Sequence, residues 1–341
     1  MGFKRLDAED FVVSADAVQS VAWSTGAPTL TDFYSSSVQE AGSSGDYYLS
    51  VYQTASTLTE AAVQFDIAYA DEKGSGSEYY NSAIPDRTPS STTYGQYRSL
   101  VLEDENANFY FGDSTNIITG SNFWVLSVER ARYKEKLFPG TFNLTLKGMD
   151  SSNGFRTVKL TDNSNDVSTQ TFLGSNRVLQ IVSGSNGSAF GTTGFVANSG
   201  SYGLFLPDIG TILLNPAALS HSIDIRANTT ADLSSGTNQK TLFTAIHSGS
   251  SFELNAEETI TSDYIFVRSR NAEFNYSENP SFISGSTGEV IFDSFINSPQ
   301  VYVTTIGLYN DSNELIAVAK LSKPILKDFT KESLVRVKLD F

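Results

Sequence analysis

Apolar and polar residues alternate with a period of two in short runs along most of the chain. The last residues show the pattern best, because Val335, Val337, Leu339 and Phe341 alternate with charged residues. Such alternation places apolar side chains on one face of a strand and charged ones on the other. The pattern predicts a half-buried strand at the end of the sequence, whereas apolar spacing typical of helices is weak throughout.

A β-hairpin is predicted just before this last strand. The runs VYVTTIGLY (Val301–Tyr309) and ELIAVAKLS (314–322) flank four turn-forming residues, Asn-Asp-Ser-Asn at 310–313. Asn and Asp tolerate left-handed backbone and form Asx turns, so a tight connection is expected between the two runs.

Similar runs between clusters of Gly, Ser, Asn and Asp predict many further strands. A short helix is expected at 207–220, where Pro, Leu and Ala interrupt the strand rhythm. The sequence therefore predicts an all-β, multi-domain protein with antiparallel, sandwich-like sheets. The further strands are expected at 46–52, 62–70, 109–111, 123–128, 141–146, 157–160, 178–182, 222–226, 241–247, 264–270 and 290–292.

Changes in composition suggest domain boundaries. Residues 1–34 are expected to form an extended N-terminal arm, because their apolar run FVVSADAVQSVAWS has no partner strand close in sequence. Residues 149–233 are richest in Gly, Ser, Asn and Thr and are expected to form an inserted β-domain with tight turns. Residues 35–148 and 234–341 are then expected to build one or more β-rich domains from both flanks.

The composition excludes several kinds of chemistry. The 341 residues are 40% hydrophobic and 12% aromatic, which is enough for packed cores, and they include no Cys and only two His. Disulfides, thiolate metal sites and cysteine nucleophiles are thereby excluded. No phosphate-binding loop or nucleophile elbow is present in the sequence. We therefore expect no catalytic residues, no cofactor and no metal site.

A few local clusters have a functional and a structural interpretation. The acids at 103–105 and 257–258 are interpreted as solvated loop charge rather than a glycosidase pair. The Asx-rich segments DNSND (162–166) and NDSNE (310–314) resemble fragments of calcium loops, but they lack the full ligand spacing and are expected to be turns. Tyr79 and Tyr80 form the one aromatic pair nominated for carbohydrate stacking, with packing as the favoured interpretation.

The net charge of −15 bears on possible partners. An acidic surface repels phosphate, so we expect neither nucleic acid nor an anionic membrane as a main partner. The N-terminal residues MGFKRLDAED lack an apolar run of signal-peptide length, and no stretch approaches the roughly 18 apolar residues of a membrane span. Synthesis and assembly in a cytoplasm are therefore expected.

Basic residues are concentrated in two places in this acidic chain. The plain interpretation of these basic clusters is a solvated strand or helix face. The sharper interpretation is that they dock onto acidic surfaces of a neighbouring copy or another protein. The candidate contact residues are Arg130, Arg132, Lys134 and Lys136 in the first cluster, and Lys323, Lys327 and Lys331 in the C-terminal one.

Several longer segments resemble a known family. They are AVQFDIAYADEKGSGS (62–77), YGQYRSLVL (94–102), FWVLSVERARYKEKLFPGTFNLTL (123–146) and the C-terminal stretch that includes YVTTIGLYNDSNELIAVAKLSKPILKDF. Together they are similar to virion structural proteins of large contractile-tailed bacteriophages, including phages of marine cyanobacteria. The segment IGLYNDSNELIAVAK is also similar to a hairpin near the attachment regions of phage tail fibres and baseplates.

The resemblance implies a baseplate or tail-associated subunit of a virion, assembled in the host cytoplasm and acting by contact. Its implied partners are other tail or baseplate proteins and further copies of itself, and it carries over no catalytic residues. A receptor-binding or carbohydrate-binding tail fibre protein is the alternative from another class. An enzyme such as a glycan depolymerase is the third and least favoured interpretation.

Overall fold

The computed structural model describes residues 4–35, 48–77, 79–85, 87–113, 116–149, 154–168, 171–231, 236–276 and 279–340. Strands make up 44% of the protein and helices 16%, and the large sheets are antiparallel, which confirms the all-β prediction. The chain divides into two compact units. Unit 1 comprises Met1–Ala17 and Thr259–Phe341, and unit 2 comprises Val18–Glu258. These bounds differ from the arm, flanks and insertion expected from composition.

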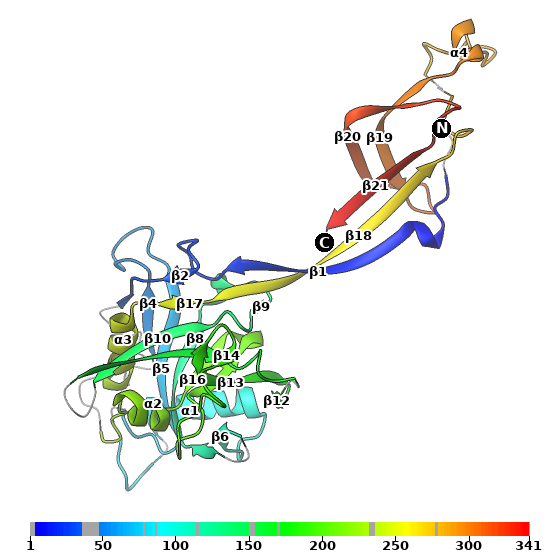
Figure 1. Ribbon diagram of the computed structural model, residues 1–341. Coiled ribbons are helices and arrows are strands. Elements are labelled where there is room, and N and C mark those ends of the chain that lie inside the picture. The colour runs from blue at the N-terminus through cyan, green and yellow to red at the C-terminus, as the bar shows by residue number, and fades with distance from the viewer. Residues whose placement is uncertain are drawn as a thin grey trace. The chain divides into compact units, whose positions relative to one another are not determined.

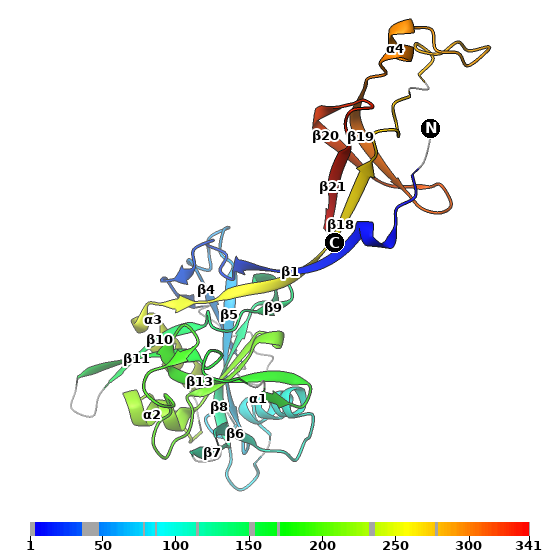
Figure 2. The same cartoon turned by 45° about the vertical axis from the view of Figure 1, so that its right-hand side comes forward.

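Unit 2 is built on one long, curled antiparallel sheet (Figures 1 and 2). Two short strands, β12 (Thr171–Leu173) and β14 (Ser188–Ala189), add to β13 beside this path. The order along the sheet is β2 (Thr29–Leu30), β17 (Phe252–Glu253), β10 (Asn143–Met149), β11 (Phe155–Asp162), β13 (Asn176–Ser185), β15 (Gly203–Leu206), β16 (Thr211–Leu214), β8 (Asn122–Val128), β5 (Val63–Asp71), β4 (Tyr48–Tyr52) and β3 (Tyr34–Ser35).

Both faces of this sheet are buried, because alternate residues of its central strands enter two separate cores. On β5, Phe65 and Tyr69 belong to the larger core, whereas Ala70 belongs to the smaller one. Helices α2 (Pro216–Ile223) and α3 (Thr237–Gly249) contribute to the larger core, and α1 (Pro89–Tyr97) covers the smaller one with the hairpin β6–β7. Strands β6 and β7 span Phe109–Gly112 and Ile117–Gly120.

The structure corrects four predictions of local structure. Residues 241–247 lie in helix α3, where the buried residues Asn238, Leu242, Ala245 and Ile246 follow helical spacing. Residues 222–226 include the end of α2 rather than a strand, and residues 290–292 precede the short helix α4 (Asp293–Asn297). The helix expected at 207–220 is divided into a 3-10 turn, strand β16 and the start of α2.

Unit 1 contains the C-terminal strand and hairpin that the sequence predicts. Strand β21 (Ser333–Asp340) pairs with β18 (Asn255–Ser269), and β19 (Val301–Tyr309) pairs with β20 (Leu315–Lys327). Val337 is buried while Arg336 is exposed, as the alternation predicts. Phe341, also expected on the apolar face, lies outside the described residues.

The N-terminal strand β1 (Phe11–Val21) also pairs with β18, so its partner lies in a distant part of the sequence. Where β1 ends, the backbone N–H of Ala22 donates to the carbonyl oxygen of Leu254 at 3.1 Å. Strand β18 also pairs with the short strand β9 (Lys136–Leu137). Among the helices in the described part of the chain, none combines the length and the apolar character needed to cross a membrane.

Candidate functional site

Unit 1 buries very little apolar surface of its own. Among its described residues, the buried hydrophobic side chains are Ile265 and Val337, with 5% and 6% of their surface exposed. Within the part of the chain that the structure describes, the two apolar cores include no residue of unit 1. A domain of this length ordinarily encloses one contiguous hydrophobic core. Unit 1 is therefore held mainly by strand pairing and polar contacts.

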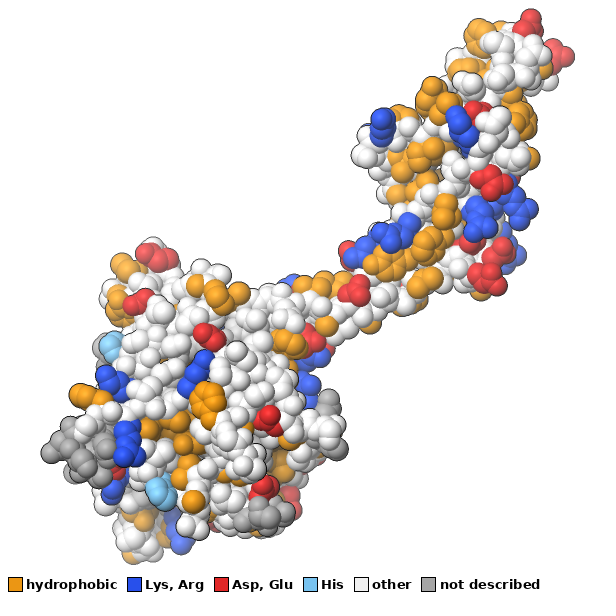
Figure 3. All heavy atoms as spheres, in the orientation of Figure 1, with side chains coloured by type: hydrophobic (Ala, Val, Ile, Leu, Met, Phe, Trp, Pro, Cys, Tyr) orange, Lys and Arg blue, Asp and Glu red, His pale blue; other side chains and the backbone are white. Residues whose placement is uncertain are grey.

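The same unit exposes much more apolar surface than its length predicts. Of the 27 large hydrophobic side chains found exposed in the described residues, fifteen belong to unit 1. In Figure 3, hydrophobic side chains of this unit appear on the surface beside Lys and Arg side chains. Exposed apolar patches bordered by polar residues are typical of protein interaction sites. They include Phe11, Val12 and Val13 of β1 and Tyr302, Leu315, Ile316 and Val318 of the hairpin.

The hairpin β19–β20 presents the clearest apolar face. Val318 lies opposite Gly307, and residues opposite each other on paired strands point to the same side of a sheet. A Cβ atom on Gly307 would lie 3.3 Å from the Leu315 side chain and 2.9 Å from the Tyr309 ring, so both cover that same side. The register shifts between Leu308 and Tyr309, so Ile316 is an extra residue of β20 beside Leu315, as in a β-bulge. Leu315, Ile316 and Val318 are 52%, 66% and 57% exposed. We call Leu315, Ile316 and Val318 the hairpin face.

Charged residues lie at both ends of the hairpin face. At its turn, Asp311 and Glu314 are exposed. At the other end, Lys320 continues the alternation of Ile316 and Val318 and is also exposed, as is Lys323. The hairpin therefore has an acidic end, an apolar centre and a basic end.

The structure corrects the expectation that Lys327 contacts a partner. Its side chain is fully buried in unit 1, where its ammonium donates to the backbone oxygen of Asn271 at 2.9 Å and to Oδ1 of Asn275 at 3.0 Å. It also donates to the backbone oxygen of Asp328 at 3.2 Å. A buried amine needs such acceptors because it has lost its water. The other two residues of this cluster are exposed, and Lys331 pairs with Asp328 at 3.3 Å.

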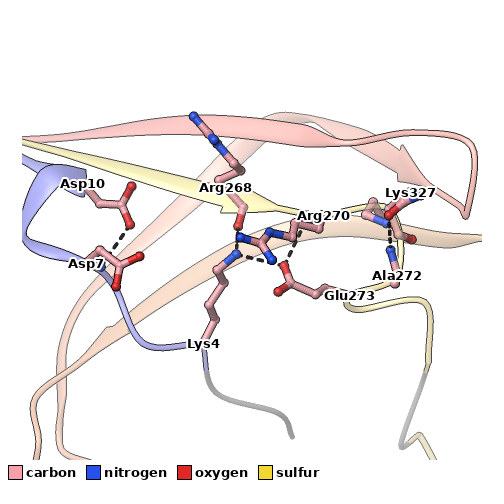
Figure 4. A network of polar contacts seen from close by, with 9 residues as sticks. Lys4, Asp7, Asp10, Arg268, Arg270, Ala272, Glu273 and Lys327 are labelled. Atoms are coloured by element: carbon pink, nitrogen blue, oxygen red, sulfur yellow. Dashed lines mark hydrogen bonds and ion pairs between the residues drawn. The ribbon is translucent and has the colours of Figure 1, made fainter.

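A second polar network fastens the N-terminal residues to the end of β18 (Figure 4). The ammonium of Lys4 donates to the backbone oxygen of Arg268 at 2.6 Å and to the carboxylate of Glu273 at 2.9 Å. The backbone N–H of Arg270 donates to the same carboxylate at 2.8 Å. This bond and the nearby ammonium of Lys4 lower the pKa of Glu273. These contacts connect the two sequence segments of unit 1.

The first basic cluster finds its partners within unit 2. Lys134 pairs with Glu258 at 2.8 Å and Lys136 approaches Glu257 at 3.8 Å, so the two acids predicted to be solvated loop charge are ion-paired. The guanidinium of Arg130 donates to two backbone oxygens and lies 4.6 Å from the ring centre of Tyr133. Arg132 is half-buried beside them. Arg130, Lys134 and Lys136 therefore have partners within the chain, and contact of this cluster with another protein stays a prediction.

In the Asx-rich segment at 162–166, side-chain oxygen atoms accept hydrogen bonds from backbone N–H groups. Asp162 is buried and accepts hydrogen bonds from the N–H groups of Ser164 and Gly140, at 2.9 and 2.8 Å. Burial raises the pKa of Asp162, and these hydrogen bonds oppose the shift. Asn163 accepts a bond from the N–H of Gln180. Within the described residues, no group of three or more His, Asp or Glu is placed to hold a metal ion.

A polar row crosses four strands of the large sheet. Ser50, Asp66, Ser127 and Thr211 lie opposite one another on β4, β5, β8 and β16. The hydroxyl of Ser50 donates to Asp66 at 2.7 Å. Burial raises the pKa of Asp66, with the Ser50 bond lowering it and the charge of Glu129 raising it further. The bond between Ser50 and Asp66 joins β4 to β5 through side chains.

An open pocket in unit 2 provides an aromatic surface. It has a volume of about 390 Å³, and its lining includes Phe33, Tyr34, Phe243 and His247. The rings of Phe243 and His247 lie 5.9 Å apart between centres. Tyr79, nominated from the sequence, is 63% exposed and does not line this pocket.

Comparisons with known proteins find no similarity to this chain: neither the family models, nor the curated proteins, nor the solved structures contain a match.

The residues of the hairpin face were missed by the sequence analysis, although a signal for them exists. The run LIAVA is apolar at successive positions, so both faces of β20 carry apolar side chains. A strand with one solvated face alternates instead. The run thus indicated a strand with apolar contacts on both sides.

Proposed function

We propose that this protein is a structural subunit of a phage virion, located in the tail or baseplate, and that it acts by protein–protein contact. The observation that carries the proposal is the imbalance in unit 1, which exposes fifteen large hydrophobic side chains among its described residues and buries two. Covering exposed apolar surface of this kind with another protein is favourable, because the surface is removed from water. The resemblance to virion structural proteins is the reason for proposing that the other protein is part of a phage tail or baseplate.

The polar organisation of unit 1 is consistent with this role. Unit 1 has small networks, such as those of Lys4 and Lys327, that fix the position of its strands without a large core. Strand pairing then holds the exposed apolar side chains of unit 1 in place, and a partner protein buries them. Interfaces of permanent assemblies commonly resemble a domain core divided between two chains.

The test is to locate the chain in phage particles. Antibodies raised against unit 2 would be applied to purified particles of the phage that encodes the chain, followed by gold-labelled secondary antibody and electron microscopy. We expect labelling at the tail or its distal end. Particles without label, combined with recovery of the chain only in the soluble fraction of the lysate, would contradict the proposal.

The aromatic pocket supports a second candidate, glycan binding by a tail fibre protein. Sugar rings stack on aromatic faces, and Tyr34 and Phe243 offer such faces at an open pocket. A glycan array probed with the full chain tests this function. Binding that is lost in Phe243→Ala and retained in the control Tyr79→Ala would support it, and absence of binding in the wild type would contradict it.

A further inference from the structure

We propose that two copies of this chain associate through the hairpin face of β19–β20, with the two hairpins antiparallel about a two-fold axis. The proposal deepens the proposed function and rests on it, because it names the partner that covers part of unit 1. It concerns Leu315, Ile316 and Val318 and the charged residues at both ends of the hairpin.

The hairpin face is an exposed patch on a two-stranded sheet. Strands β19 and β20 pair only with each other among the described residues. A two-stranded hairpin is marginally stable in water unless it packs against another surface. The outward side chains of Ile316 and Val318 are more than half exposed, so a partner that covers them removes apolar area from water.

The order of charges along the hairpin favours a second copy as that partner. Asp311 and Glu314 precede the apolar centre, and Lys320 and Lys323 follow it. In a two-fold interface, if residue i contacts residue j, then j of one copy contacts i of the other. An antiparallel copy therefore places the acids of each hairpin against the lysines of its partner. A parallel copy would instead place like charges together.

The spacing of the residues fits this arrangement. Strand residues advance about 3.3 Å each, so Glu314 and Lys320 are separated by roughly 20 Å along the strand, and the register with β19 shifts beyond Lys320. Val318 lies near the middle of this interval, and Gly307 lies opposite it without a side chain. The two-fold axis would pass close to Val318, where the surface is apolar and the glycine opposite leaves space for a side chain of the other copy.

Reversed-charge variants of the full chain test the pairing. The base-reversed variant carries Lys320→Glu and Lys323→Glu, and the tip-reversed variant carries Asp311→Lys and Glu314→Lys. We expect each variant alone to dissociate at a concentration at least about tenfold higher than the wild type, because each change introduces repulsion on both sides of the axis. Mixing the two variants should restore association, since every reversed end then meets an opposite charge.

The measurement is sedimentation equilibrium over a range of concentrations, with circular dichroism to show that each variant keeps its strands. The matched control reverses Lys134 and Glu258, which pair within unit 2, and should leave association unchanged. The variant Val318→Asp should abolish association. A wild type that stays monomeric at every concentration, or a mixture of the two variants that stays monomeric, would overturn the proposal.

This experiment separates the pairing from the proposed function. Gold-labelled tails together with a monomeric chain would reject the two-fold pairing and keep the virion role. A dimer that responds to the variants as described, together with unlabelled particles, would keep the pairing and reject the role.

Discussion

The ammonium nitrogen of Lys327 lies 3.0 Å from the side-chain oxygen of Asn275, and both side chains are buried. A positive charge is thus enclosed by uncharged oxygen atoms, two of them from the backbone. The contact joins the end of β20 to the segment that follows β18. This amine makes three hydrogen bonds in a unit that has few buried apolar side chains among its described residues.

The variant Lys327→Met should therefore destabilise unit 1. It leaves the buried side-chain oxygen of Asn275 without its donor, at a cost of about 1–3 kcal/mol in the free energy of unfolding. The backbone oxygens of Asn271 and Asp328 still accept from Asn275 Nδ2 and from the N–H of Lys331. Urea unfolding of the full chain, followed by hydrogen exchange of the β19 and β20 amides, measures the loss. The control Lys323→Met changes an exposed lysine and should shift stability by about 0.5 kcal/mol or less. Equal effects of the two variants would contradict the role of the buried amine.

Strand β21 provides a second prediction. Val337→Asp places a carboxylate at one of the two buried hydrophobic positions in the described part of unit 1 and should cost several kcal/mol. Leu334→Asp, on the same strand but 58% exposed, is the matched control and should have little effect. The measurement is hydrogen exchange of the β18 amides that pair with β21. Unchanged protection in Val337→Asp would count against this packing.

The polar row predicts a pH dependence. Because burial raises the pKa of Asp66 above 3.8, the native state binds its proton more tightly than the unfolded state does. The stabilisation from this group is complete below the unfolded pKa and is lost as the pH rises through the higher folded pKa. Asp66→Asn should remove this loss, so its stability relative to wild type should increase with pH.

Urea unfolding between about pH 3 and about pH 7 measures this difference. Glu105→Gln, at an exposed position, serves as the control and should follow the wild-type curve. An Asp66→Asn curve that runs parallel to the wild type at every pH would disprove the assignment.

A chelator should leave the melting temperature unchanged. The oxygen atoms of Asp162 and Asn163 already accept backbone hydrogen bonds, so the segment at 162–166 forms a turn without an ion. Differential scanning calorimetry with and without EDTA tests this expectation. A large fall in melting temperature that calcium reverses would show that an ion site had been overlooked.

Local sequence predicted the elements whose determinants lie close together. The hairpin is an example, because Oδ1 of Asn310 accepts the N–H groups of Ser312 and Glu314 and so closes the turn within five residues. Helix α3 was mistaken for a strand because its β-branched residues also suit strands. The helix is favoured because the buried residues on one of its faces pack against β10 and β5, which are distant in sequence.

The candidate site could be predicted only in part, because some of its contacts also join residues that are distant in sequence. The clustering of lysines near the C-terminus is visible in the sequence, but the burial of Lys327 depends on Asn271 and Asn275, which precede it by some fifty residues. Likewise, the ion pairs of Lys134 and Lys136 depend on Glu258 and Glu257. Sequence alone indicates that charges are present, whereas the distant partner decides which of them stay available.

The pairing of β1 with β18 has a consequence for synthesis on the ribosome. Strand β1 is made well before its partner strand, and it carries the exposed Phe11, Val12 and Val13. Its partner strand begins at Asn255. At about 5–20 residues per second, the nascent β1 waits on the order of tens of seconds before β18 is made. During that interval the unpaired strand is open to chaperones and to other nascent chains, so the yield of folded protein should depend on how quickly translation reaches β18.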